Sequence, residues 1–124
     1  MNGWVLLATV LAGGAAGAAR YLTARLWPTP SGRVSRSVLL VNLAGSAVGG
    51  AVLGLAERAL LSPELSLVLL AGVCGGLTTF STWSVETIEL FGNGHWRAAL
   101  LNVGLGLTSG LAACALAYSV VRAV

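Results

Sequence analysis

Residues 75 to 83 read Gly75-Gly76-Leu77-Thr78-Thr79-Phe80-Ser81-Thr82-Trp83, which places four hydroxyl side chains and two glycines in the middle of a long apolar segment. Hydrocarbon offers no water to such groups, so a polar cluster at that depth normally faces a partner helix, a bound ion or a water-filled path. The glycine pair, followed by β-branched threonines, favours a local break in the helix. A break would free backbone carbonyls to bind a cation.

The side chains of this run separate into two faces. On a continuous helix, Phe80 and Trp83 point to nearly the same side, whereas Thr78 and Thr82 point to the opposite one. The hydroxyls either line a path or donate to carbonyls one turn earlier in their own helix, as intramembrane threonines often do. Four hydroxyls beside two glycines favour the first interpretation.

The composition around this run is that of an integral membrane protein. Of the 124 residues, 56% are apolar and only 9% are charged, far from the averages of soluble proteins. Segments of about 20 apolar residues predict four membrane-spanning helices at about 3–27, 35–56, 65–91 and 96–121. We expect one all-α domain over residues 1–124, with the first span retained as a helix and the third one broken.

Catalytic patterns are not found in the sequence. The two cysteines, Cys74 and Cys114, fall within predicted spans, where a thiol usually acts as a small apolar residue. The single histidine, His95, stands beside Trp96 in a short loop and is expected at the membrane interface. Since metal-ligand clusters, phosphate loops and nucleophile–base pairs are missing, we do not expect an enzyme.

The arginines are nearly balanced across the membrane. All seven basic residues are arginine. One side carries four of them and the other carries the amino terminus with two: Arg25, Arg33, Arg36 and Arg97 against Arg58 and Arg122. Because loop arginines set orientation, so small a bias leaves two possibilities open. The chain inserts in both orientations and forms an antiparallel dimer, or a partner or its local context fixes one orientation.

Glycines and a few polar residues remain inside the spans. Small residues four apart, such as those at 13 and 17, 45 and 49, and 106 and 110, predict close helix packing and oligomerisation. Arg20 either extends to the headgroups or supplies a fixed positive charge at a vestibule. Asn42 either bonds a neighbouring helix or faces a pathway. Asn102 repeats this pattern in span four, with Ser109 on its face.

Three motifs together resemble the CrcB or Fluc family of fluoride ion channels. They are GGAAGAARY at 13–21, VNLAGS at 41–46 and GVCGGLTTFST at 72–82, in three of the four spans. The resemblance implies a dual-topology homodimer with two antiparallel fluoride pores, in agreement with the balanced arginines. It also implies a structural Na⁺ at the dimer interface, bound by the backbone carbonyls of Gly75 and Thr78.

The same resemblance places Asn42 along the pore and Phe80 in an aromatic box. The edge of an aromatic ring is positive, so it can face fluoride without trapping it. Ser81 and Thr82, with the Asn42 amide, would replace part of the hydration shell that the anion loses in a narrow passage. Arg20 would then lie in the vestibule.

Two positions depart from the family pattern. Trp83 stands where the family usually has a second phenylalanine; its bulk is expected to narrow the path, and its indole N–H to offer a stronger donor than a ring edge. In span four, Asn102 and Gly106 replace a tyrosine and a serine, and Thr108 and Ser109 are expected to supply the polar lining. Members of the family also pair as heterodimers of two homologues, and this chain fits one half of such a pair.

We therefore expect a passive fluoride exporter of a bacterial-type plasma membrane, with fluoride and membrane lipid as its partners and no nucleic acid. The alternative is a small dual-topology proton-coupled multidrug exporter, which needs a carboxylate in the membrane. Spans one and two lack one, and Glu86 lies past the polar run near the end of span three. A third possibility is a membrane scaffold in which Asn42 and the hydroxyls only hold helices together.

Overall fold

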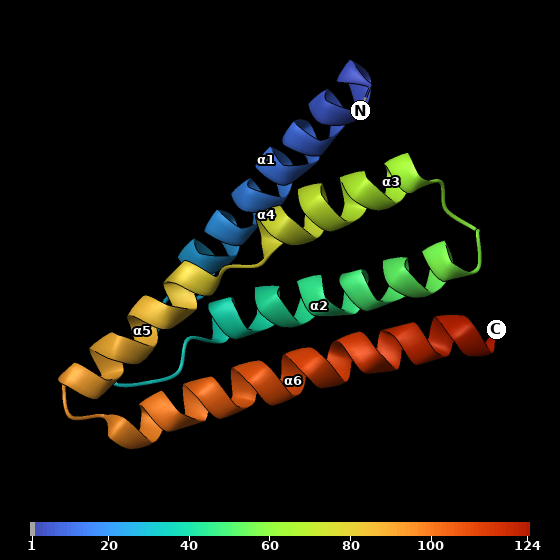
Figure 1. Ribbon diagram of the computed structural model, residues 1–124. Helices are drawn as coiled ribbons and strands as arrows, with labels where there is room; N and C mark the ends of the chain where they lie inside the picture. The colour runs from blue at the N-terminus through green and yellow to red at the C-terminus, as the bar shows by residue number, and fades with distance from the viewer. Residues whose placement is uncertain (1) are drawn as a thin grey trace.

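The computed structural model describes residues 2–124, and its regular elements are all helical (Figure 1). Four helical spans are long and apolar enough to cross a membrane, as predicted. Three of them correspond to single helices, α1 (Gly3–Leu26), α2 (Arg36–Glu57) and α6 (Trp96–Ala123). The third span, Pro63–Gly92, is broken as expected. It consists of α3 (Pro63–Leu67), η1 (Val68–Cys74), α4 (Gly75–Leu77) and α5 (Phe80–Gly92).

Local caps set where the spans begin. The Ser35 hydroxyl accepts a hydrogen bond from the Val38 N–H and starts α2. The Ser62 hydroxyl accepts from the Leu65 N–H, and Pro63 takes the first helical position of α3. This cap explains why the third span begins two residues before the predicted Leu65. The η1 segment is a π-helix of seven residues, a form that the sequence pattern did not predict.

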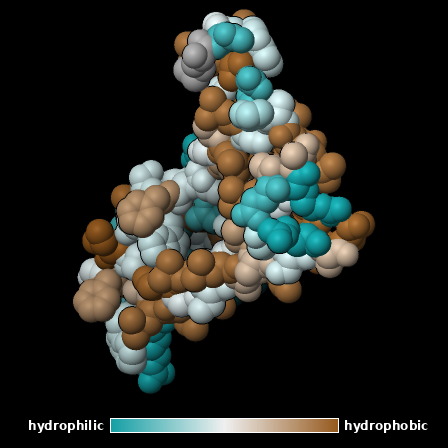
Figure 2. Space-filling model, turned by 45° about the vertical axis from the view of Figure 1, so that its right-hand side comes forward, coloured by the Kyte–Doolittle hydropathy of each residue, from teal (hydrophilic) through white to brown (hydrophobic). Residues whose placement is uncertain are grey.

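Helix α2 lies at the centre of the molecule and runs parallel to α6 (Figure 1). It is the most buried span, with 33% of its apolar window inside the molecule against 11% for each of the other three. Glycine permits its contact with α6, since a Cβ at Gly50 would collide with the Cys114 carbonyl and one at Gly54 would lie 3.2 Å from the Tyr118 carbonyl oxygen. Because the other three spans are less buried, they carry most of the exposed large apolar side chains. Figure 2 shows apolar side chains over one face of the molecule.

Helix α1 packs against the first half of the broken span. A Cβ at Gly72 would lie 2.8 Å from the Thr9 carbonyl oxygen, and one at Gly76 would collide with the Gly13 carbonyl. The predicted glycine faces at 13 and 17, 45 and 49, and 106 and 110 all meet a neighbouring segment within 4 Å. The closest backbone approaches nevertheless occur at Gly50, Gly72 and Gly76.

The loops and helix ends are held by specific contacts. Gly32 has a φ of +77°, and the imidazole of His95 lies over it, 2.6 Å from where a Cβ would stand. The first and third loops therefore meet on one side of the membrane. At the opposite ends of α2 and α6, the Glu57 carboxylate accepts hydrogen bonds from the Tyr118 hydroxyl and the Arg122 guanidinium.

Candidate functional site

The third span is interrupted at Thr78 and Thr79, which we call the break. Both residues have extended backbone, with φ and ψ of −81° and 155° for Thr78 and of −145° and 119° for Thr79. Helix α4 ends just before them and α5 begins just after them at Phe80. The predicted interruption therefore falls two residues after the Gly75-Gly76 pair.

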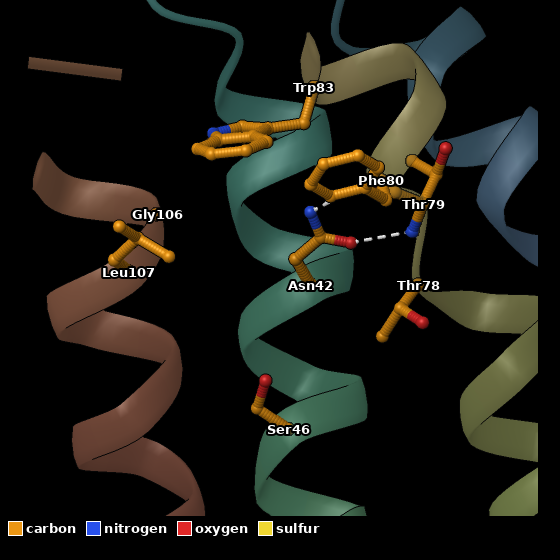
Figure 3. Close-up of a pocket in the computed structure, with 8 residues that line it drawn as sticks. All are labelled: Asn42, Ser46, Thr78, Thr79, Phe80, Trp83, Gly106 and Leu107. Carbon is orange, nitrogen blue, oxygen red and sulfur yellow. Dashed lines mark hydrogen bonds between the residues drawn. The ribbon is translucent and has the colours of Figure 1, made fainter. Parts of the chain in front are cut away.

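Side chains replace the helical hydrogen-bond partners of the peptide groups around the break. In an unbroken α-helix the Thr79 N–H would donate to the Gly75 carbonyl; it donates instead to Asn42 Oδ1 at 2.8 Å. Asn42 Nδ2 donates in turn to the Thr79 carbonyl at 3.2 Å (Figure 3). The Thr82 N–H, which would reach the Thr78 carbonyl, donates to Thr79 Oγ1 at 3.2 Å. The carbonyls of Gly75 and Thr78 thus lack the amide donors that a continuous helix supplies.

Arg20 also reaches this region. Its Nε donates to the Gly76 carbonyl at 3.2 Å, and Gly76 is the residue whose carbonyl would have accepted from the Phe80 N–H in an unbroken helix. Half-buried Arg20 lines a cavity of about 230 Å³ together with Thr79 and Thr82. The guanidinium is therefore directed at the break, while its role in a vestibule stays a prediction.

The hydroxyls of the run have different roles. Thr78 Oγ1 donates to the Cys74 carbonyl at 2.8 Å, so for this residue the self-satisfied alternative is correct. Thr79 Oγ1 bonds Thr82 Oγ1 at 3.0 Å and lies 3.4 Å from Ser81 Oγ. Thr79 thus caps α5 and organises the cluster, a role that the sequence reasoning missed. A threonine three residues before Thr82 at a helix start is the signal that would have revealed it.

A cavity of about 320 Å³ opens beside the break (Figure 3), and we call it the break cavity. Its lining brings residues of α2, the break, α5 and α6 together: Asn42, Ser46, Thr78, Thr79, Phe80, Trp83, Gly106 and Leu107. Three of the residues predicted for the fluoride path, Asn42, Phe80 and Trp83, therefore share one space. Thr82 and Arg20 line the smaller cavity, and Thr79 belongs to both.

Two predicted path residues, Ser81 and Ser109, line neither of these two cavities. Ser81 is exposed, and the Ser109 hydroxyl donates to the Leu105 carbonyl of its own helix. The polar wall on this side is supplied instead by Ser46, one turn after Asn42. Ser46 lies one turn after Asn42 on the same helix, and that spacing is the signal that would have revealed it.

The aromatic residues lie side by side at one end of the break cavity. The ring centroids of Phe80 and Trp83 are 5.6 Å apart and their planes are inclined by 46°. Phe80 is 78% exposed. The indole N–H of Trp83 donates to the Asn102 carbonyl at 3.1 Å, so the expectation that it offers a free donor to the path is wrong. The α6 backbone already accepts that hydrogen bond.

A family model described as CrcB-like protein, Camphor Resistance (CrcB), matches residues 7–118. The chain belongs to this family. Its CrcB-like relatives include the Fluoride-specific ion channel FluC 2 of Symbiobacterium thermophilum, 41% identical over 86% of this chain and 89% of the relative. The Fluoride-specific ion channel FluC 1 of Mycobacterium bovis is 42% identical over 95% and 91%. The FluC 1 channel of Yersinia pseudotuberculosis is 36% identical over 94% and 93%.

The chemistry of this CrcB-like site is that of neutral donors and aromatic rings within an apolar surround. In the described chain, neither the break cavity nor the Arg20 cavity is lined by a carboxylate. Glu86 and Glu89 line a separate cavity of about 260 Å³ beside the loops, with Arg33 and His95. The proton-coupled drug exporter is therefore not supported, since it needs a carboxylate in its intramembrane binding site.

Proposed function

We propose that this chain forms a fluoride-selective ion channel. The observation that carries the proposal is the break, where an amide, hydroxyls and two aromatic rings face one cavity inside a membrane-spanning segment. Named relatives that are fluoride-specific channels, at 36–42% identity over most of their length, support the same function. The chain is accordingly a conducting protein and not an enzyme.

Several hydrogen-bond donors, each of them weak, would allow an anion to pass. Asn42 Nδ2 carries two hydrogens, and one of them is used by the Thr79 carbonyl. The second remains for an anion. The Phe80 ring is largely exposed and presents a positive edge, while Ser81 and Thr82 at the start of α5 supply hydroxyls. Several weak sites in series favour conduction over tight binding, and the narrow passage excludes chloride and larger anions.

The membrane potential supplies the driving force. One elementary charge gains about 2.3 kcal/mol per 100 mV across a membrane. In a plasma membrane whose inner side is negative, a passive path therefore expels fluoride from the cytoplasm without ATP. Fluoride enters as the neutral weak acid and dissociates inside, so selective export of the anion lowers its toxicity.

Two oppositely oriented copies complete the pathway in this proposal. The break cavity lies at the surface of a single copy, and Phe80 on its wall is 78% exposed. A second copy across this surface would enclose the path, and the nearly balanced arginines suit insertion in both orientations. A paired homologue in place of the second copy is the alternative, because Trp83 and Gly106 depart from the family pattern.

A structural Na⁺ belongs to the same proposal. The carbonyls of Gly75 and Thr78 have lost their helical donors to Asn42 and Thr79. Carbonyl oxygens without donors in a low-dielectric surround are suitable ligands for a hard monovalent cation. The residues present therefore fit the ion, which would balance the partial negative charge at the end of α4.

The function is tested by anion efflux from liposomes that contain the purified protein alone. We expect rapid fluoride release, read with a fluoride electrode, and no chloride release under the same potential. Equal release of both anions would contradict the channel, and absence of both would contradict the homodimer. Fluoride release that returns only when a second homologue from the same genome is added would indicate the heterodimer.

A further inference from the structure

Three hydrogen bonds connect Trp83 with α6 and with Thr87 at the α6 side of the break cavity. Its Nε1 donates to the Asn102 carbonyl at 3.1 Å. The Asn102 side chain, 2% exposed, donates to Thr87 Oγ1 at 2.9 Å. Thr87 Oγ1 donates in turn to the Trp83 carbonyl at 2.8 Å. The backbone and the indole of Trp83 are therefore linked through one partly buried set of hydrogen bonds.

Gly106 supplies the space that the indole occupies. A Cβ at this position would lie 2.8 Å from Trp83 Nε1 and 3.3 Å from Cε2. Both distances are too short for an ordinary contact of a Cβ atom, so a Cβ at 106 would have to displace the indole. Even alanine at 106 would therefore push the ring toward Phe80 and into the break cavity. In contrast, Gly104 on the same helix has no atom within 4 Å of its Cβ position.

These contacts determine which part of the indole the cavity meets. Because the indole N–H points to the α6 backbone, Trp83 presents only ring carbons to the cavity and offers it no hydrogen-bond donor. Trp83 thus lies beside Phe80 as a second ring surface, with centroids 5.6 Å apart. The large side chain of Trp83 thus packs into the space that Gly106, which has no side chain, leaves open.

We propose that Asn102 and Gly106 are positioning residues that hold Trp83 as a fixed wall of the break cavity, and that this wall sets the size of anion admitted. The second half of the proposal rests on the proposed channel function. The first half concerns the ring alone and can be measured without any ion flux.

Exchange of the indole proton tests the positioning. Protein labelled with ¹⁵N-tryptophan has four indole signals, and Trp83→Phe identifies the signal of residue 83. The other three tryptophans are more than half exposed: Trp4 at 61%, Trp27 at 55% and Trp96 at 51%. We expect the Trp83 proton to exchange with D₂O at least about tenfold more slowly than these three. Equal exchange would overturn the proposal, and Gly106→Ala should abolish the difference.

Efflux from liposomes tests the wall through a double-mutant cycle. Gly106→Ala should lower fluoride release about tenfold, equivalent to about 1.4 kcal/mol, while Gly104→Ala should leave it unchanged. In the Trp83→Phe background, Gly106→Ala should change release less than about twofold, because the smaller ring leaves room. Trp83→Ala, which removes the ring altogether, should raise chloride release relative to fluoride about tenfold.

The outcomes separate this inference from the proposed function. If the wild type conducts and Gly106→Ala acts equally in both backgrounds, the positioning role is wrong. If Gly106→Ala does not fold, an unchanged fluoride-to-chloride ratio in Trp83→Ala overturns the wall by itself. If the wild type releases no anion while the Trp83 proton is protected, the homodimeric channel fails and only the positioning of the ring is retained.

Discussion

The side-chain amide of Asn42 forms two hydrogen bonds with the peptide groups of Thr79, accepting from its N–H at 2.8 Å and donating to its carbonyl at 3.2 Å. A side-chain amide carries a donor and an acceptor on separate atoms, as a peptide group does. Asn42 therefore substitutes for a neighbouring peptide and keeps the break open. Of the two roles that the sequence left open for Asn42, these hydrogen bonds show the structural one, and the pathway role belongs to the proposed channel.

Replacement of Asn42 should affect stability and conduction together. Asn42→Ala leaves the Thr79 N–H and carbonyl unpaired at buried Thr79, which should cost about 1–3 kcal/mol of folding free energy and abolish fluoride release. Asn42→Asp keeps the acceptor for the Thr79 N–H but lacks the N–H that faces its carbonyl. We expect Asp to fold better than Ala in thermal melts in detergent and to conduct equally poorly in liposomes. Full fluoride release by Asn42→Ala would contradict the pathway role, and an unchanged melting temperature would contradict the structural one.

The contribution of Arg20 to fluoride release should depend on the geometry of its guanidinium as well as on its charge. Its Nε, and not a terminal nitrogen, donates to the Gly76 carbonyl, a position that lysine cannot reproduce. We therefore expect Arg20→Lys to lose most of the fluoride release, close to the loss in Arg20→Gln. The measurement is the initial efflux rate at low and high ionic strength. A fully active Arg20→Lys would show that only the positive charge matters.

Removal of Na⁺ should weaken the assembled protein. Exchange of Na⁺ for the large organic cation N-methyl-D-glucamine leaves the carbonyls of Gly75 and Thr78 without the proposed ion. We therefore expect a lower melting temperature and less dimer in size-exclusion chromatography. Thr78→Ser keeps the carbonyl and the hydroxyl and should retain the Na⁺ dependence. Gly75→Pro, which alters the backbone itself, should remove it. A melting temperature indifferent to Na⁺ would exclude the ion from the fold.

The glycine contact between α2 and α6 gives a prediction that is independent of conduction. Gly50→Ala forces its methyl group against the Cys114 carbonyl and should destabilise the protein by about 1–3 kcal/mol. Gly14→Ala is the matched control, because a Cβ there has no atom within 4 Å and alanine favours the helix. Thermal melts of the two variants should move in opposite directions. Equal melts would show that α2 and α6 are farther apart than described.

The spans and the existence of a break follow from local composition, and for that reason both are readable in the sequence. Apolar runs set the four helices, while Gly75-Gly76 with the threonines predicts an interruption. Its location at Thr78 and Thr79 depends on Asn42, which is 37 residues away. Distant partners of this kind have no local signature, and the same is true of the π-helical turn that precedes the break.

The departures at Trp83 and Gly106 illustrate the same limit. In the sequence they are separate substitutions, 23 residues apart, and each one looks unfavourable for a pore. In the fold, the indole fills the space that the glycine leaves and its N–H is bonded to Asn102. Only the contact between α5 and α6 shows that they compensate each other. Likewise, only the fold shows that Ser46 lines the break cavity and that Ser109 does not.

The contact between His95 and Gly32 places the single histidine on one side of the membrane, so labelling of His95 reports the orientation of each chain. His95 is the single histidine, is exposed, and lies where the first and third loops meet on one side of the membrane. In sealed vesicles, an impermeant imidazole reagent added outside would label every chain or none if all copies point the same way. Oppositely oriented pairs would be labelled at half of their histidines, whichever way the vesicle faces.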